Sequence, residues 1–133
     1  MTERISPALV TDVLARQSHA IDEGDAAAWA ATYTPDGSFF SPTYGDAIVG
    51  TENLIRFAEW VYLDLRADGI QQRHWLNNVV VDDDTATAHS YLLIIRTGPD
   101  GNASLLRHVT AHDRLAFHDG ELRVRAREVR RDA

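Results

Sequence analysis

Two residues far apart in the chain, Asp22 and His74, have the types needed for proton transfer. A neutral imidazole is a good general base, and a carboxylate can fix its tautomer and stabilise the imidazolium that forms. Asp22 lies at the end of a predicted helix, and His74 lies near the start of a predicted strand. We expect the two side chains to form the catalytic pair of an acid–base site.

A third candidate, Asp113, follows from the alternation of side chains on a strand. On the predicted strand 104–117, every second residue forms an apolar face with this single acid in its middle. A charged group that faces the interior needs a partner. Asp113 is therefore either a second catalytic acid or hydrogen-bond donor, or one half of an ion pair with an arginine such as Arg107 or Arg125.

The elements that must position these residues are segregated along the chain. Hydrophobic periodicity and turn residues predict three helices followed by four long strands. The predicted helices are 7–22, 26–33 and 52–66; a turn at 36–37, a short strand at 38–41 and a loop or second short strand at 43–49 separate the last two. The long strands are 72–81, 85–96, 104–117 and 121–129. This order predicts an α+β fold in which a curved antiparallel sheet and the helices enclose a cone-shaped pocket.

Length and charge narrow the classes of protein. The 133 residues fit one domain, 1–133, and the net charge of −7 disfavours a nucleic-acid partner. The C-terminal arginines recur mostly at every second position, which predicts the solvated face of a strand. No apolar run is long enough for a signal peptide or a membrane span, so we expect a cytoplasmic protein with no membrane partner.

Cofactor and metal motifs are missing from the sequence. The chain has no cysteine, and it contains no glycine-rich phosphate loop or nucleophile motif. His108 and His112 lie four residues apart on a predicted strand, a separation of roughly 13 Å that does not suit one metal ion. We expect chemistry without a cofactor or metal.

The local motifs and their order resemble the NTF2-like superfamily and, within it, the SnoaL-like proteins, over nearly the whole chain. The matching segments are Ala20-Ile-Asp-Glu-Gly-Asp25, Tyr33-Thr-Pro-Asp-Gly37, Gly50 before the third helix, Arg73-His74 with Asn77-Asn78, Asp84-Thr-Ala86, and Asp119-Gly120. The pattern is most similar to the branch that contains scytalone dehydratase, bile-acid 7α-dehydratase and hexachlorocyclohexane dehydrochlorinase. That resemblance implies proton abstraction by an Asp–His pair, and Asp22 and His74 occupy the matching positions.

Two departures from the family patterns restrict the reaction. Ser41 stands where ketosteroid isomerase carries its catalytic acid, and Gln17 stands near the lysine of the dehydrochlorinase. The resemblance also places Asp113 near the isomerase's oxyanion-binding acid. The aromatic residues predict a pocket for a flat or hydrophobic substrate. The expected substrate-binding residues are Phe40, Ser41, Tyr44, Phe57, Trp60 and Asn78.

The sequence leaves two classes of function open. The first is a cofactor-free lyase, isomerase or cyclase that acts on a hydrophobic, polyketide- or steroid-like small molecule, by dehydration or cyclisation. The second is a non-catalytic small-molecule-binding or assembly module with the same fold. Contact between Asp22 and His74 at an open cavity would favour the first. The resemblance further implies a homodimer that packs through the outer face of the sheet.

Overall fold

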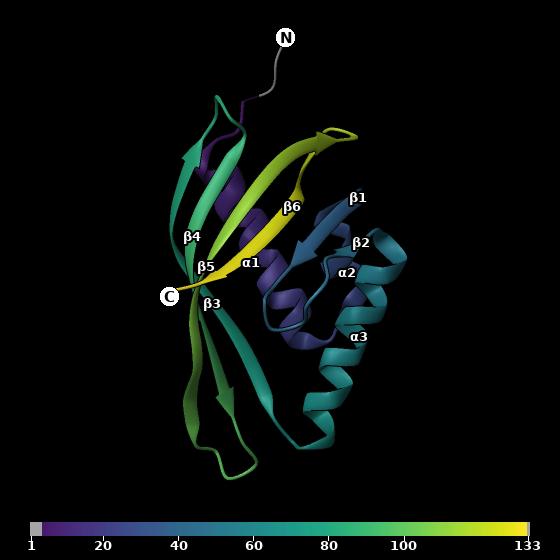
Figure 1. The fold of residues 1–133 in the computed structure, drawn as a ribbon, viewed down its shortest axis with the longest axis vertical. Helices are drawn as coiled ribbons and strands as arrows, with labels where there is room; N and C mark the ends of the chain where they lie inside the picture. The colour runs from purple at the N-terminus through teal and green to yellow at the C-terminus, as the bar shows by residue number, and fades with distance from the viewer. Residues whose placement is uncertain (1–3, 133) are drawn as a thin grey trace.

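The computed structural model describes residues 4–132 and confirms the predicted α+β class. The helices are α1 (Pro7–Glu23), α2 (Ala26–Ala31) and α3 (Thr51–Ala67). The strands are β1 (Tyr33–Phe40), β2 (Ile48–Val49), β3 (Gln71–Asp82), β4 (Thr87–Thr97), β5 (Ala103–His118) and β6 (Glu121–Arg131). The three helices pack on one face of a curved sheet, whose strands β3 to β6 sweep along one side of the molecule (Figure 1).

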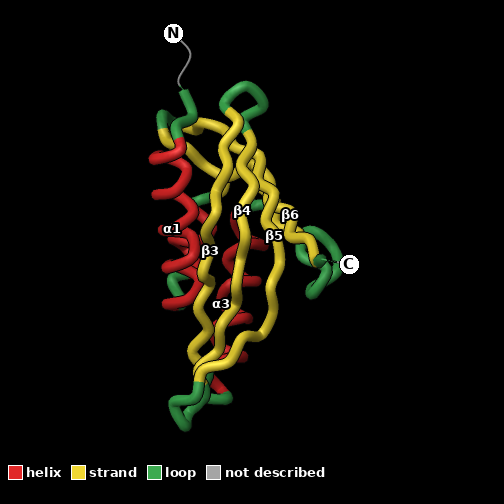
Figure 2. Tube along the Cα trace, turned by 90° about the vertical axis from the view of Figure 1, so that its left-hand side faces the viewer, coloured by secondary structure: helices red, strands yellow, loops and turns green. Residues whose placement is uncertain are grey.

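The sheet has six strands in the order β2-β1-β6-β5-β4-β3. Strands β3 to β6 form the predicted antiparallel meander, and β1 joins it by pairing in parallel with β6. Turned by 90°, the long strands lie as one layer, with α1 and α3 on its inner side (Figure 2). The predicted inward face of β5 is confirmed, since Val109, Ala111, Asp113 and Leu115 are all buried.

A bulge changes which residues of β6 face inward. Arg125 is an extra residue between the pairs Leu115–Val124 and Arg114–Ala126. A bulge of one residue reverses the alternation beyond it, so Arg127 and Val129 face the interior in place of Ala126. The prediction that all the C-terminal arginines lie on a solvated face is therefore wrong for Arg127.

The segment before β2 also differs from the sequence prediction. The predicted turn at Asp36–Gly37 lies inside β1, where the pairing with β6 is interrupted between Tyr33 and Ser38 and then resumes. The second helix ends at Ala31, two residues earlier than predicted, because Tyr33 already pairs with Val124 of β6. Pairing with a distant strand is a tertiary effect that local turn signals do not reveal.

The end of α1 is built so that Asp22 stays in its last turn. Gly24 caps the helix in the left-handed conformation, with φ of 81°, and Asp25 donates its backbone N–H to the carbonyl of Ala20. A Cβ atom at Gly24 would lie 2.8 Å from the ring of Tyr62 on α3. Gly24 therefore supplies both the backbone conformation and the space that this helix end requires.

Gly24→Ala is expected to lower the free energy of unfolding by about 2 kcal/mol or more, through left-handed strain and overpacking against Tyr62. Gly45→Ala is the matched control, because Gly45 also has a positive φ but no atom lies within 4 Å of the position that its Cβ would take. The control should lose only about 1–2 kcal/mol. Urea unfolding of both variants measures the difference, and equal losses would show that the contact with Tyr62 is unimportant.

Candidate functional site

Asp22 and His74 are in direct contact, although 52 positions separate them. Nδ1 of His74 lies 2.6 Å from Oδ1 of Asp22, and the backbone N–H of His74 donates to Oδ2 at 2.8 Å. An ionised carboxylate can only accept hydrogen bonds, so Nδ1 carries the hydrogen. Nε2 of the neutral ring is then free of a hydrogen and can accept a proton.

The end of α1 and the start of β3 are joined by a further hydrogen bond. Gln71 donates its side-chain N–H to the backbone carbonyl of Asp22 at 3.0 Å. The Asp22 side chain is only 6% exposed, and that of His74 is 17% exposed. An acid at a helix C-terminus is unfavourable for the helix dipole, and the two N–H groups of His74 compensate for it. These contacts fix the imidazole in one orientation.

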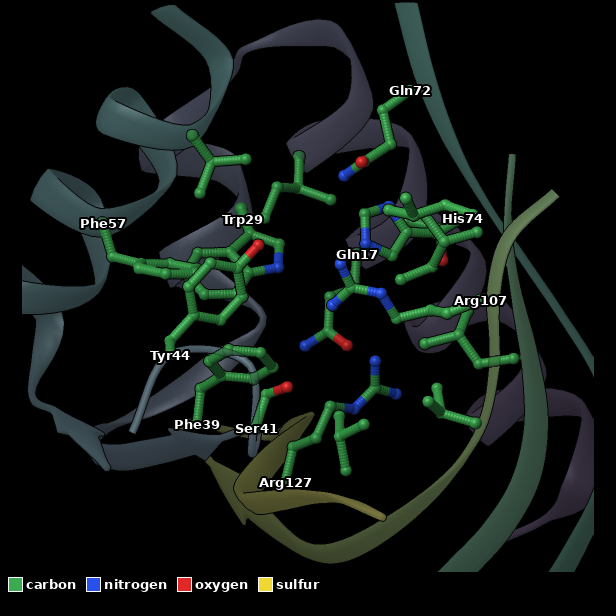
Figure 3. A pocket seen from close by; sticks show the side chains of 18 residues that line it. Gln17, Trp29, Phe39, Ser41, Tyr44, Phe57, Gln72, His74, Arg107 and Arg127 are labelled. Carbon is green, nitrogen blue, oxygen red and sulfur yellow. The ribbon is translucent and has the colours of Figure 1, made fainter. Parts of the chain in front are cut away.

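His74 lines a cavity between the helices and the concave face of the sheet. The cavity has about 670 Å³ of empty space, part of which is open to solvent. Its aromatic wall consists of four residues, Trp29, Phe39, Tyr44 and Phe57, which face the polar side chains across the cavity (Figure 3). Phe57 lies against Tyr44 and Phe39, with ring centroids 4.9 and 5.4 Å apart. A wall of packed rings suits a flat, hydrophobic ligand.

Two glutamines bring uncharged polar groups to the same cavity. The side-chain oxygen of Gln72 accepts a hydrogen bond from Nε of Arg96 at 2.9 Å, which leaves its NH₂ group to face the cavity (Figure 3). Gln17 is fully buried and donates to Thr32 at 2.8 Å, while its buried oxygen has no partner among residues 4–132. The cavity therefore offers one amide donor and one unpaired amide acceptor to a ligand.

Asp113 forms a buried ion pair with Arg127. Its two oxygens accept from Nε and Nη2 of Arg127 at 2.8 and 2.9 Å, and the two side chains are 0% and 7% exposed. Burial lowers the pKa of Arg127, but the charge and hydrogen bonds of Asp113 outweigh it and leave this pKa above its ordinary value. The ion-pair alternative for Asp113 is thus the one that fits, although its partner is neither Arg107 nor Arg125. An ionised acid that already accepts two hydrogen bonds is a poor proton donor.

The other residues expected to bind substrate lie in three different places. Ser41, Tyr44 and Phe57 line the cavity, and the hydroxyl of Ser41 accepts from the backbone N–H of Thr43 at 3.3 Å. Phe40 and Asn78 line hollows on the other face of the sheet. Trp60 is 56% exposed and does not line the cavity.

Local geometry explains why Phe40, Asn78 and Trp60 lie outside the cavity. Phe39 and Arg127 are partners on the inward face of the paired strands, so Phe40 points the opposite way with its partner Glu128. Asn78 has a positive φ of 54° at the bulge of β3, a conformation that asparagine tolerates. Trp60 precedes the buried Val61 on α3 and is turned about 100° from it around the helix axis.

Three further residues line the cavity but are not among the site residues expected from the sequence: Gln72, Arg107 and Arg127. Simple alternation indicates the first two, since Gln72 lies two residues before His74 and Arg107 lies two residues before Val109. No local signal in the sequence indicates that Arg127 faces the cavity, because the bulge at Arg125 determines the direction of its side chain.

The chain matches the sequence profile of a known family over nearly its whole length. The sequence profile of the SnoaL-like domain matches residues 6–128. The chain belongs to the SnoaL-like family. No curated protein sequence matches it.

Solved structures of similar proteins agree with the SnoaL-like assignment. Aln2 from a Streptomyces species is 30% identical, with a TM-score of 0.82 over 98% of this chain and 95% of that one. ActVI-ORFA from Streptomyces coelicolor is 30% identical, with a TM-score of 0.82 over 94% of this chain and 93% of that one. An NTF2-like protein with a cystatin-like fold from Novosphingobium aromaticivorans is 19% identical and has a TM-score of 0.76 over 92% and 79% of the two chains. The last similarity confirms the NTF2-like fold.

The described residues of this SnoaL-like chain, 4–132, contain neither a cluster of potential metal ligands nor a helix that could span a membrane. No group of three or more acidic, histidine or cysteine side chains within that range could hold a metal ion. No helix in the same range is long and apolar enough to cross a membrane.

Proposed function

We propose that this SnoaL-like protein is a lyase or cyclase that removes a proton beside a carbonyl group of a flat, hydrophobic small molecule. The observation that carries this proposal is the contact between Asp22 and His74, made where His74 lines an aromatic cavity. A base, a group that orients it and a place for the substrate are the minimum that such a reaction needs. A polyketide-like substrate, with its ketones and fused rings, fits this wall.

In the proposed first step, Nε2 of His74 takes a proton from the carbon next to the carbonyl. The electron pair of the broken C–H bond forms an enolate, and Asp22 stabilises the imidazolium that results. In a dehydration, the enolate re-forms the carbonyl and expels a β-hydroxyl group, which leaves as water with the proton from His74. In a cyclisation, the enolate carbon attacks a second carbonyl carbon, and His74 returns the proton to the new alkoxide.

Gln72 is the proposed hydrogen-bond donor to the enolate oxygen. It lies two residues before His74 on the same face of β3, about 7 Å away along the strand. Its bond from Arg96 fixes which end of the amide faces the cavity, so the donor is already oriented before the substrate binds. Donors that are fixed in this way stabilise developing negative charge without reorganisation.

Exchange of an acidic C–H proton tests this proposal without knowledge of the natural substrate. The protein is incubated in D₂O with 2-tetralone, a flat bicyclic ketone, and deuterium incorporation is followed by NMR. We expect deuterium exchange well above the rate in buffer alone. Exchange at the buffer rate would contradict proton abstraction from this class of ketone and would favour the non-catalytic binding module.

Asp22→Asn is expected to lower the exchange rate about 10²-fold or more. The backbone N–H of His74 would hold the amide oxygen, so the amide NH₂ would face Nδ1 and shift the hydrogen to Nε2. The base would then be blocked while the fold remains. ¹⁵N NMR of the His74 ring reports the tautomer directly, and an unchanged tautomer in this variant would contradict the positioning role of Asp22.

A further inference from the structure

Two arginines and no acidic side chain of residues 4–132 line the cavity. The chain carries 20 acidic and 13 basic residues, yet Arg107 and Arg127 line the cavity and, within residues 4–132, no aspartate or glutamate does. Both guanidinium groups point into the cavity (Figure 3). A charge in such surroundings needs a partner of opposite sign, and the two arginines differ in how that need is met.

Arg107 has no carboxylate partner in the part of the chain that the structure describes. Its Nη1 donates to the hydroxyl of Thr43, and no acidic oxygen of residues 4–132 lies within ion-pair distance of it. Arg131 donates to the same hydroxyl at 3.4 Å, so two cations share one neutral acceptor. Like charges gathered without a counter-charge favour the binding of an anion at this point.

Arg127 contributes a second donor. Asp113 occupies Nε and Nη2, which leaves Nη1 with no hydrogen-bond partner among the described residues, on a side chain that lines the cavity. The buried pair holds the guanidinium plane in place, and the planar fork of an arginine matches a carboxylate better than a point charge does. Ser41 lines the same cavity and adds a hydroxyl group.

We propose that the ligand of this cavity is a flat, hydrophobic carboxylic acid, whose carboxylate binds Arg107 and Nη1 of Arg127 while its body lies against the aromatic wall. This inference rests on the proposed function only in assigning the cavity to the substrate. Binding of the acid does not require proton transfer by His74. The two claims can therefore fail separately.

Calorimetry with two probes of the same shape tests the carboxylate subsite. The probes are 2-naphthylacetate and its neutral amide, 2-naphthylacetamide, in a low-salt buffer of zwitterionic composition. The acid is expected to bind about tenfold more tightly than the amide, the difference that a charged hydrogen bond makes. Equal affinities, or no binding of the acid, would overturn the proposal.

Arg107→Gln is expected to reduce the preference for the acid to about twofold or less, whereas Arg107→Lys should retain part of it. Arg107 has no acidic partner among the described residues, so the fold should not depend on it. Arg56→Gln is the matched control, because it removes the same charge from an exposed ion pair on α3. Loss of the preference in the control, or its persistence in Arg107→Gln, would overturn the subsite.

Two further measurements separate this inference from the proposed reaction. Rising salt should weaken binding of the acid more than binding of the amide in the unaltered protein. His74→Ala should keep the preference for the acid although it loses proton exchange. If His74→Ala lost the preference for the acid over the amide, the carboxylate would be bound by the imidazolium of His74. That result would overturn the role of the arginines.

Discussion

His74→Ala is expected to lower the rate of α-proton exchange into 2-tetralone by about 10²–10⁴-fold, the usual contribution of a positioned general base. The side chain is 17% exposed and lines the cavity, and its Nδ1 is fixed by Asp22. No other histidine of residues 4–132 lines this cavity, so none is placed to take over the proton. NMR in D₂O measures the rates of both proteins.

His118→Ala is the control for the loss of a histidine. His118 lies at the β5–β6 turn, beside Asp119 and away from the cavity. This variant should exchange protons at the unaltered rate. If His74→Ala also retained nearly all of its activity while folded, the imidazole would not be the base, and the proposed reaction would fail.

Asp113→Ala is expected to lower the free energy of unfolding by about 3–5 kcal/mol, because it leaves the charge of Arg127 buried without its partner. The side chains of Asp113 and Arg127 are only 0% and 7% exposed, so little water reaches the guanidinium to take the place of the lost carboxylate. Urea unfolding measures the loss. The paired replacement Asp113→Leu with Arg127→Met should restore much of it, since an apolar pair of similar volume needs no charge compensation.

The exposed pair Glu52–Arg56 is the control for the contribution of an ion pair to the free energy of unfolding. Its side chains are 88% and 72% exposed, so Glu52→Ala should cost about 1 kcal/mol or less. If Asp113→Ala cost no more than Glu52→Ala, the interior pair would not stabilise the fold. The paired variant is expected to lose much of the preference for 2-naphthylacetate over its amide, because Arg127 is also part of the proposed carboxylate subsite.

The fold class and the separate positions of Asp22 and His74 follow from patterns that are local in the sequence. Asp22 is placed by a helix whose end is marked by Gly24, and His74 is placed by the alternation of β3. Both signals need only a few neighbouring residues. The resemblance to the SnoaL-like proteins then connects two positions that no local pattern brings together.

The rest of the site depends on pairing between distant segments. Arg127 faces the cavity because Arg125 forms a bulge opposite β5, and a bulge in one strand is defined only by its partner. Asn78 faces outward for the same reason on β3. The identity of Asp113's partner was missed because the bulge, and not simple alternation, brings Arg127 beside it.

The central claim is that Asp22 and His74 act as one unit, and a double-mutant cycle of the exchange rate tests it most directly. If Asp22 acts only by orienting the imidazole, its replacement has no effect once that ring is gone. The variant that combines Asp22→Asn with His74→Ala should therefore exchange protons within about twofold of His74→Ala alone. A further loss as large as the one that Asp22→Asn causes by itself would show independent roles and contradict the account.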